Sequence, residues 1–182
     1  RRSAAGHTTE ANAYVVESRL NLYSNFTYFL NDPVNGDQFN QRDHRNVLGG
    51  NVSHTWGVDD TNAVAMHNTL GLQLRQDDIQ AGLTYTAQRQ PIQSVREDQI
   101  QQLLVGVYGE NAATWAAWFK TVTGVRLDQY TAHVTSAMLA DNSGTHQSQQ
   151  ISPKFSAILG PWQVTELFFN IGHGFHSNDA RG

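Results

Sequence analysis

The chain has 182 residues, a formal net charge of −4, no cysteine and only 15% charged residues. The lack of cysteine excludes disulfide frameworks, thiolate metal sites, iron–sulfur clusters and cysteine nucleophiles. Mild acidity with only two lysines, Lys120 and Lys154, argues against a nucleic-acid binder, because such a protein needs a dense basic surface. No run of eighteen apolar residues occurs, so no transmembrane helix is expected, whereas a transmembrane β-strand needs only about 9–11 residues.

Amide side chains outnumber charged ones. The sequence contains 14 Asn and 16 Gln, which make 30, against 12 basic and 16 acidic residues, which make 28. A soluble domain usually has about a quarter of its residues charged. The sequence therefore predicts a surface that is polar without being highly charged.

The first predicted strand covers residues 14–30, where apolar and polar side chains alternate. Even positions include Leu20 and Leu22, and odd positions include Glu17 and Arg19. A mean strand has ~5–6 residues, so an alternation of about seventeen residues is roughly three times too long for an ordinary sandwich. The next strand is predicted over 46–57.

The third predicted strand, 63–90, changes the parity of its apolar residues. Three leucines between residues 70 and 74 occupy even positions, whereas Ile79 and later apolar residues occupy odd ones. A β-bulge at Asp77–Asp78 would keep the apolar side chains on one face of a single strand, and a tight turn there is the alternative. The remaining predicted strands, for a total of seven, are 97–110, 114–133, 151–159 and 163–175.

The connections between these strands are predicted to alternate between longer and shorter ones. In chain order they are 31–45, 58–62, 91–96, 111–113, 135–150 and 160–161. Short turns on one side and longer loops on the other are typical of outer-membrane barrels. All four tryptophans lie near the turns predicted to be short, which indicates an aromatic girdle, with core tryptophans at strand ends as the alternative. They are Trp56, Trp115, Trp118 and Trp162.

These patterns predict an all-β fold: an antiparallel meander of long strands, forming an arc of about seven strands of a large transmembrane β-barrel over residues 1–182. A bacterial barrel normally has an even number of strands. Unpaired strand edges inside lipid would cost several kcal/mol per group, so the arc is expected to belong to a larger barrel. The side chains expected to form its lipid-facing apolar band are Leu20, Leu22, Phe26, Leu70, Leu72 and Leu74.

Catalytic and metal sites find little support in the sequence. Ser53 and His54 are adjacent, and no Gly-x-Ser-x-Gly motif occurs, so no enzyme is expected. His173 and His176 point to opposite faces of an extended strand, and zinc needs three or four converging ligands, so no metal site or cofactor is expected. The acidic segment 32–38 does not match the spacing of an EF-hand loop.

Three other charged residues are expected to face the barrel lumen as arginine–carboxylate pairs: Arg75, Arg126 and Glu110.

Several segments resemble the barrel of TonB-dependent outer-membrane receptors. They are residues 26–39 (FTYFLNDPVNGDQF), 68–75 (NTLGLQLR) with 77–79 (DDI), 152–155 (SPKF) leading to 160–162 (GPW), and 166–182 (ELFFNIGHGFHSNDARG). The resemblance spans roughly 20–182. It implies a 22-stranded barrel plugged by an N-terminal domain and energised by an inner-membrane complex, which imports scarce solutes such as ferric siderophores. The sequence itself is predicted to contain neither the plug domain nor the energy-coupling box.

The resemblance implies a set of partners and a location. The expected partners are the lipid bilayer, the plug and remaining barrel of the parent protein, the TonB complex and a small-molecule solute, in the outer membrane of a Gram-negative bacterium. The solute is expected to contact the loops 31–45, 91–96 and 135–150. The residues predicted to make such contacts are Asp32, Asn35, Asp37, Gln38, His176, Asp179 and Arg181. The alternative is a soluble β-sandwich or lectin-like binding module.

Overall fold

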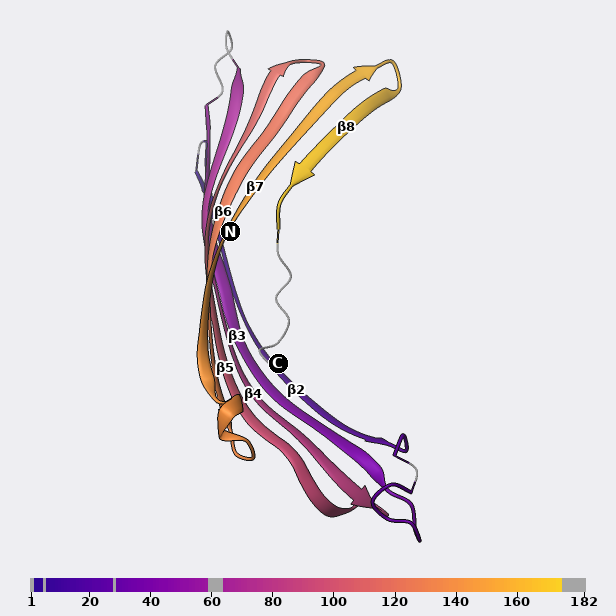
Figure 1. Cartoon of the computed structure of the whole chain (residues 1–182). Coiled ribbons are helices and arrows are strands. Elements are labelled where there is room, and N and C mark those ends of the chain that lie inside the picture. Colours follow the sequence, from indigo (N-terminus) through magenta and orange to yellow (C-terminus); the bar gives the residue numbers. More distant parts are fainter. Residues whose placement is uncertain (1, 5, 28, 59–63, 175–182) are drawn as a thin grey trace.

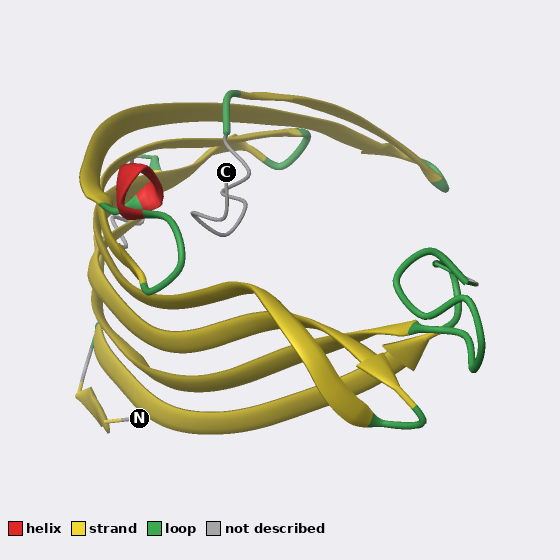
Figure 2. Cartoon of the chain, turned by 60° about the horizontal axis from the view of Figure 1, so that its bottom comes forward, coloured by secondary structure: helices red, strands yellow, loops and turns green. Residues whose placement is uncertain are grey.

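A computed structural model of the chain describes residues 2–4, 6–27, 29–58 and 64–174. The described residues form one antiparallel sheet in which every strand pairs with its neighbour in sequence. The sheet curves into a half-barrel, and no other described part of the chain forms a second layer against either face (Figures 1 and 2). The predicted all-β meander is therefore confirmed.

Seven strands follow a short strand at the N-terminal end. The strands are β1 (Arg2–Ala4), β2 (His7–Ser24), β3 (Gln38–Val58), β4 (Ala65–Ala87), β5 (Gln90–Ala116), β6 (Phe119–Ser136), β7 (Gly144–Trp162) and β8 (Thr165–Gly172). A 3₁₀ turn, η1 (Ala140–Asn142), precedes β7. Among the described residues, no helix is long and apolar enough to cross a bilayer.

Most strands extend further than the sequence predicted. Residues 38–45 and 91–96, expected in loops, belong to β3 and β5. The exception is β2, which begins at His7 but ends at Ser24, so residues 25–30, predicted as strand, lie in the first connection. Residues 111–113 lie inside β5, and 160–161 lie inside β7. The loop expected over 135–150 is reduced to residues 137–143. Loop lengths therefore alternate less clearly than predicted, because the β4–β5 connection is a two-residue turn.

That β4–β5 turn consists of Gln88 and Arg89, which both have positive φ, at 48° and 63°. Two consecutive left-handed residues are what a tight hairpin turn of the favoured hand requires. Glycine and asparagine are the usual residues in such turns, so this turn could not be predicted from the residues Gln88 and Arg89.

The predicted bulge at Asp77–Asp78 is wrong, although β4 is a single long strand as expected. Asp77 pairs with Val47 and Gln102, and Asp78 pairs with Asn46 and Gln101, without a break in register. The irregularities between β4 and β5 occur instead near Leu83–Thr86. The apolar residues before and after Asp77 therefore lie on opposite faces of the sheet.

The side chains on the two faces of the curved sheet differ in how deeply they are buried. Side chains on the inside of a curved sheet converge, and Ile79 and Ile100, which are cross-strand partners, are both 0% exposed. On the opposite face Leu70, Leu72 and Leu74 are 55%, 43% and 41% exposed. The face of Ile79 and Ile100 is therefore the concave face, and the face of the three leucines is the convex face.

Register also corrects the predicted apolar band. Leu20 pairs with Asp43, and Leu22 with Gln41, which places both leucines on the concave face. Phe26 lies in the loop that follows β2. The predicted alternation in β2 is real, but its apolar set lies on the side opposite Leu70, Leu72 and Leu74.

Candidate functional site

The convex face carries a continuous apolar band. Directly opposed residues share a face, so the register assigns to it Leu48, Val52, Leu70, Leu72, Leu74, Leu103, Val105, Val107, Val125, Leu127, Ile151 and Phe155. Many of these side chains are about half exposed, with nothing packed against them. An exposed apolar surface of this extent marks contact with a membrane or a partner.

The edge of this band runs diagonally across the hydrogen-bonded rows. One row joins Val15 of β2, through β3, β4 and β5, to Thr131 of β6. On the convex face of β2, the last apolar residue before the polar segment is Val15, which lies in this row. On the convex face of β6 it is Leu127, which precedes Thr131, the residue of β6 in this row, by four positions. Four residues over the four steps from β2 to β6 is an average of one residue per strand, although Leu48 of β3 and Leu103 of β5 lie on the row itself.

This shift measures the tilt of the strands relative to the band. One residue advances about 3.3 Å along a strand while the neighbouring strand lies about 4.8 Å away, which corresponds to a tilt of roughly 35°. Transmembrane barrels have strands tilted by about 35–45°. The band thus has the slope that a membrane-spanning barrel requires.

Aromatic residues border the band at the end with the short hairpins. Trp115 and Trp118 both stack on Phe119, with ring centroids 6.5 Å and 5.7 Å apart. Trp115 Nε1 donates a 2.8 Å hydrogen bond to Thr121 Oγ1. Trp56 stacks on His54 at 5.9 Å. Such rings, apolar on their faces and polar at one edge, are enriched at membrane interfaces.

The concave face carries charged pairs made within single strands. Arg75 donates from Nε and Nη2 to the carboxylate of Asp77 at 2.8 and 2.9 Å. Arg126 binds Asp128 in the same way, at 2.6–2.9 Å. Arg96–Asp98 is the third pair with the spacing Arg-x-Asp, and in all three of these the acidic side chain is the more buried partner. Arg45 and Asp43 of β3 form a further pair within one strand, with Nη2 and Oδ2 3.6 Å apart.

The predicted lumenal position of Arg75, Arg126 and Glu110 agrees with this face, because it is the concave one. The sequence signal that was missed is the triplet Arg-x-Asp, which occurs in β4, β5 and β6. Residues two apart in a strand point to the same side, so each triplet can form a local ion pair. Glu110 pairs with Lys154 across the intervening strand β6.

Glycines allow large side chains to lie flat on the concave face. A Cβ at Gly71 would lie 2.2 Å from Cζ of Tyr108, its cross-strand partner. A Cβ at Gly49 would lie 2.3 Å from the Tyr14 ring, and one at Gly106 would lie 2.2 Å from Arg126. The side chains of the concave surface are therefore closely packed against the sheet itself.

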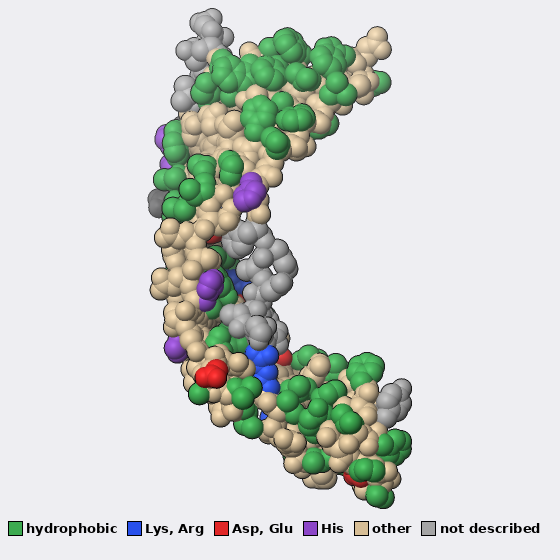
Figure 3. All heavy atoms as spheres, in the orientation of Figure 1, with side chains coloured by type: hydrophobic (Ala, Val, Ile, Leu, Met, Phe, Trp, Pro, Cys, Tyr) green, Lys and Arg blue, Asp and Glu red, His purple; other side chains and the backbone are tan. Residues whose placement is uncertain are grey.

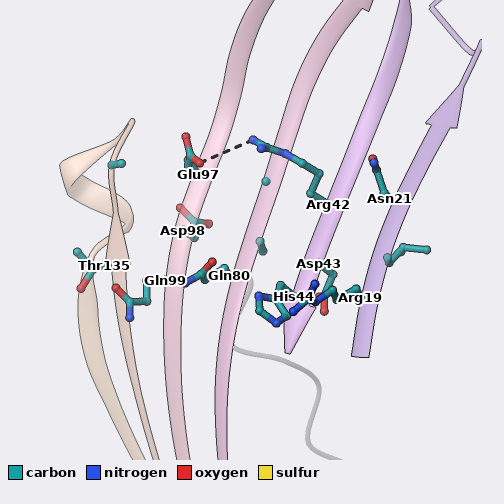
Figure 4. A pocket seen from close by; sticks show the side chains of 14 residues that line it. Arg19, Asn21, Arg42, Asp43, His44, Gln80, Glu97, Asp98, Gln99 and Thr135 are labelled. Carbon is teal, nitrogen blue, oxygen red and sulfur yellow. Dashed lines mark ion pairs between the residues drawn. The ribbon is translucent and has the colours of Figure 1, made fainter. Parts of the chain in front are cut away.

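Shallow hollows lie on the convex face at the loop end and on the concave face. The first, about 690 Å³, is lined by residues of β2 to β6. In it Arg42 reaches over Gly82 toward Glu97, with Nη2 and Oε1 3.7 Å apart (Figure 4). A hollow of about 280 Å³ lies beside Tyr108, Arg126 and the Glu110–Lys154 pair. In the space-filling view the visible basic side chains lie on the inner side of the arc (Figure 3).

The loop of residues 25–37 holds three of the residues predicted to contact a solute. Asp32 Oδ1 accepts hydrogen bonds from the backbone N–H groups of Val34 and Asn35 at 3.0 and 2.9 Å. Asp37 is 2% exposed and accepts from the N–H and side-chain amide of Asn31 at 2.9 and 3.1 Å. The hydrogen bond from the Asn35 backbone lowers the pKa of Asp32. For Asp37, burial raises the pKa, but hydrogen bonds from Asn31, Thr27 and Asp32 outweigh it and lower the pKa.

These bonds shape the loop itself. Gln38, at the start of β3, donates from Nε2 to Asn25 Oδ1 at 2.7 Å, which ties the two ends of the loop together. The loop exposes the apolar side chains of Phe26, Phe29, Leu30 and Val34, and also the polar side chains of Asn25, Asn31 and Asn35. The role of the loop in solute contact stays a prediction. The predicted positions His176, Asp179 and Arg181 lie outside the described residues.

Within the described part of the chain, no group of three or more His, Asp or Glu side chains could hold a metal ion. His173 is placed beside Gln150, whose Nε2 lies 2.9 Å from its Nδ1.

Comparison with known proteins identifies the family. The chain matches the model of the family "TonB dependent receptor-like, beta-barrel" over residues 2–181. It is also similar to the ferric citrate transporter FecA in its unliganded form, with a TM-score of 0.78 and 10% sequence identity. That match covers 94% of this chain and 25% of the other, so the chain spans about a quarter of that transporter's length. Among curated proteins no match was found.

The family match covers nearly the whole chain, and the structural match reproduces its arc of strands. The family is one of receptors and transporters rather than enzymes, in agreement with the prediction that the chain has no catalytic role. The chain therefore belongs to the TonB-dependent receptor-like β-barrel family.

Proposed function

We propose that the chain is part of the barrel wall of a TonB-dependent receptor in the outer membrane of a Gram-negative bacterium. The observation that carries the proposal is the tilted apolar band on the convex face, opposed by paired charges on the concave face. This combination suits a wall with lipid on one side and a polar lumen on the other. The family match supports the same location.

The partners follow from the two edges of the sheet. β2 and β8 lie at or beside the edges of the described sheet, and their outer backbone groups need partners inside a membrane. We propose that further barrel strands of the same protein pair with them, and that a plug domain fills the lumen. The TonB complex would supply energy through that plug.

The proposed activity is uptake of a scarce solute, such as a ferric siderophore. FecA, the structurally similar protein, is named a ferric citrate transporter, which supports an iron complex as the first solute to test. We propose that the loop 25–37 contacts the solute, with Asp32, Asn35, Asp37 and Gln38 shaping or contacting it. For His176, Asp179 and Arg181 the proposal rests on the sequence alone.

A soluble β-sandwich is disfavoured as the alternative. Such a fold packs a second sheet against the apolar face of the first. In the described part of the chain one sheet is present, and its leucine-rich convex face is bare.

Cysteine labelling tests the membrane placement. Leu72→Cys and Gln80→Cys lie on the convex face of β4, inside and beyond the band, and the chain has no other cysteine. In intact cells a water-soluble maleimide is expected to label Gln80→Cys and to leave Leu72→Cys unlabelled, because hydrocarbon excludes the reagent. Equal labelling at both positions would contradict the placement.

Iron uptake tests the transport activity separately. Cells that carry the full receptor are offered radioactive ferric citrate or a ferric tris-catecholate, with and without TonB. Accumulation that needs both the receptor and TonB is the expected result. Accumulation independent of the receptor would reject iron-complex uptake without bearing on the labelling result.

A further inference from the structure

Two histidines from neighbouring strands meet on the convex face, at the end of the sheet that carries the β5–β6 hairpin. His7 lies in β2 and His54 in β3, and the register pairs His7 with Trp56 and Thr9 with His54, so all four side chains share one face. Both histidines are exposed, whereas Thr9 and Trp56 are half-buried. His54 follows Val52 by two positions, so the two histidines, called the histidine pair here, lie at the border of the apolar band.

The two imidazole rings of the histidine pair point nitrogen atoms at each other. His7 Nδ1 and His54 Nε2 lie 3.4 Å apart, and the ring centroids lie 5.5 Å apart. The centroid separation exceeds the nitrogen separation by 2.1 Å, which is close to two ring radii, so both nitrogens lie between the rings, near the line that joins them. The pair therefore presents two facing nitrogen atoms, which share one proton or hold one cation.

Thr9 and Trp56 fix the orientation of His54. His54 Nδ1 lies 2.8 Å from Thr9 Oγ1, so the hydroxyl oxygen can accept a hydrogen bond from Nδ1–H. In that tautomer Nε2 carries no proton and offers its lone pair toward His7. The His54 ring also stacks on Trp56, with the ring planes inclined by 24°. Histidines that bind metal ions usually have such an oxygen partner at their second nitrogen.

The nitrogen separation suits a transition-metal ion. Metal–imidazole bonds to Zn²⁺ are about 2.0–2.1 Å long, and two of them at a tetrahedral angle place the nitrogens about 3.3–3.4 Å apart. The 3.4 Å between His7 Nδ1 and His54 Nε2 falls in this range. An ion can thus bind without movement of either strand, and rotation of the exposed His7 ring is enough to aim its lone pair.

Two ligands make an exchangeable site rather than a structural one. Structural zinc sites use four ligands, and in the described part of the chain no third His, Asp or Glu joins the pair. Water fills the remaining positions. Cu²⁺ binds nitrogen ligands more tightly than Ni²⁺ or Zn²⁺, so copper is the expected ion. Sequence spacing could not indicate the site, because its two ligands are 47 residues apart.

We propose that His7 and His54 bind one Cu²⁺ ion, and that Thr9 is the residue that positions His54. The bound ion ties β2 to β3 through side chains, in addition to the backbone hydrogen bonds between the two strands. The inference is independent of the proposed transport, because it uses only the pairing of β2 with β3.

The test uses the full receptor in detergent, stripped of metal with EDTA and transferred to a buffer that does not bind copper. Cu²⁺ is titrated in, and electron paramagnetic resonance counts the bound ions and records splitting by ligand nitrogens. The variants are His54→Ala, which removes a ligand, and Thr9→Val, which keeps both ligands and removes only the hydroxyl group. The matched control is His67→Ala, because His67 of β4 pairs with Gly57 on the concave face at the same end of the sheet.

The wild-type receptor is expected to bind one more Cu²⁺ ion than His54→Ala, with splitting from two imidazole nitrogens. Loss of a group that orients a histidine ligand typically costs about 10–100-fold in metal affinity, so Thr9→Val is expected to bind this ion about tenfold more weakly. His67→Ala is expected to match the wild type. Copper is also expected to raise the melting temperature of the wild type and of His67→Ala, but not that of His54→Ala, because the ion binds only the folded pair.

Equal copper binding by the wild type and His54→Ala, or an equal loss in His54→Ala and His67→Ala, would overturn the proposal. Unchanged copper affinity in Thr9→Val would overturn the role of Thr9. Thermal unfolding without copper shows whether His54→Ala is folded. If it is not, His7→Ala takes its place, since His7 is exposed and begins β2. Loss of the copper site would leave the cysteine labelling of the membrane placement unaffected.

Discussion

Close contacts between single residues determine how the concave face is packed. Gly71, on the concave face, and Gly109, on the convex face, show the difference between two glycines of neighbouring strands. A Cβ at Gly71 would lie 2.2 Å from the Tyr108 ring, whereas a Cβ at Gly109 would have no atom within 4 Å. Only the first glycine is required by its neighbour.

Gly71→Ala is therefore expected to destabilise the receptor, and Gly109→Ala is not. The ring of Tyr108 would have to move away from the wall, and such overpacking typically costs about 1–3 kcal/mol. Gly109→Ala is expected to be neutral or to stabilise by about 0.5 kcal/mol, because it restricts the unfolded chain. Thermal unfolding of both variants in detergent measures the difference. An equal melting temperature for the two would show that Tyr108 does not depend on Gly71.

For the charged residues of the concave face, the sequence predicted the position but not the partners. Arg75, Arg126 and Glu110 were expected to face the lumen, but their partners were not identified. The partner of each arginine lies only two positions away, at Asp77 and Asp128. A search for triplets would have found them, since side chains two apart in a strand share a face.

At the scale of elements, the existence of the strands was predictable but their ends were not. Alternation is visible where one face meets the apolar band and the other is polar. In residues 38–45 and 91–96 both faces of the sheet carry many polar side chains, so the period of two disappears and the sequence resembles a loop. The predicted loops were therefore the polar extensions of strands.

The prediction of a β-bulge at Asp77–Asp78 was wrong for a related reason. The prediction assumed that apolar residues stay on one face along a whole strand. In β4 the leucines face outward within the band, and Ile79 faces the crowded concave side beyond it. One strand thus passes through two environments with opposite requirements.

The loop 25–37 is the element in which pH has a defined effect. The pKa values of Asp32 and Asp37 are lower than usual in the folded loop, because N–H groups bind their ionised forms. Their contribution to the order of the loop is full above the ordinary carboxyl pKa of about 4, and it is lost as the pH falls through the lower folded value. The loop is therefore expected to keep its shape at neutral pH and to loosen below about pH 4.

A spin label at Val34→Cys measures this loosening. Val34 is 84% exposed, so the label does not disturb the loop. The spectrum is expected to sharpen below about pH 4, and Asp37→Asn is expected to sharpen it already at neutral pH. A spectrum that does not change in either case would show that the carboxylates do not order the loop.

At the scale of the whole molecule, the slope of the band fixes how the sheet stands in a membrane. The register gives a shift of one residue per strand between β2 and β6, which corresponds to a tilt of roughly 35°. Polarised infrared spectra of the receptor in oriented bilayers are expected to give this average strand tilt. Strands parallel to the membrane normal would contradict the identification of the band.

The family could be inferred from the sequence because its signal is spread over most of the chain. The solute could not, because the loop residues that looked suited to bind it are engaged in holding the loop together, and other predicted positions lie outside the described residues. The alternation of apolar and polar residues in a strand depends only on the environment of each face, which is common to all barrels of this kind. The choice of solute depends instead on particular side chains that distant loops bring together.

The ion pairs within single strands also bear on assembly. A pair such as Arg126–Asp128 forms as soon as its own strand is extended, before any neighbour docks. Strands β4, β5 and β6 can thus each neutralise a buried carboxylate with an arginine of the same strand, although Asp77 also has Arg45 of β3 4.0 Å away. The choice of neighbour is left to backbone pairing and to hairpin connections, so strands can be added one after another to a growing edge without exposing an unmatched charge.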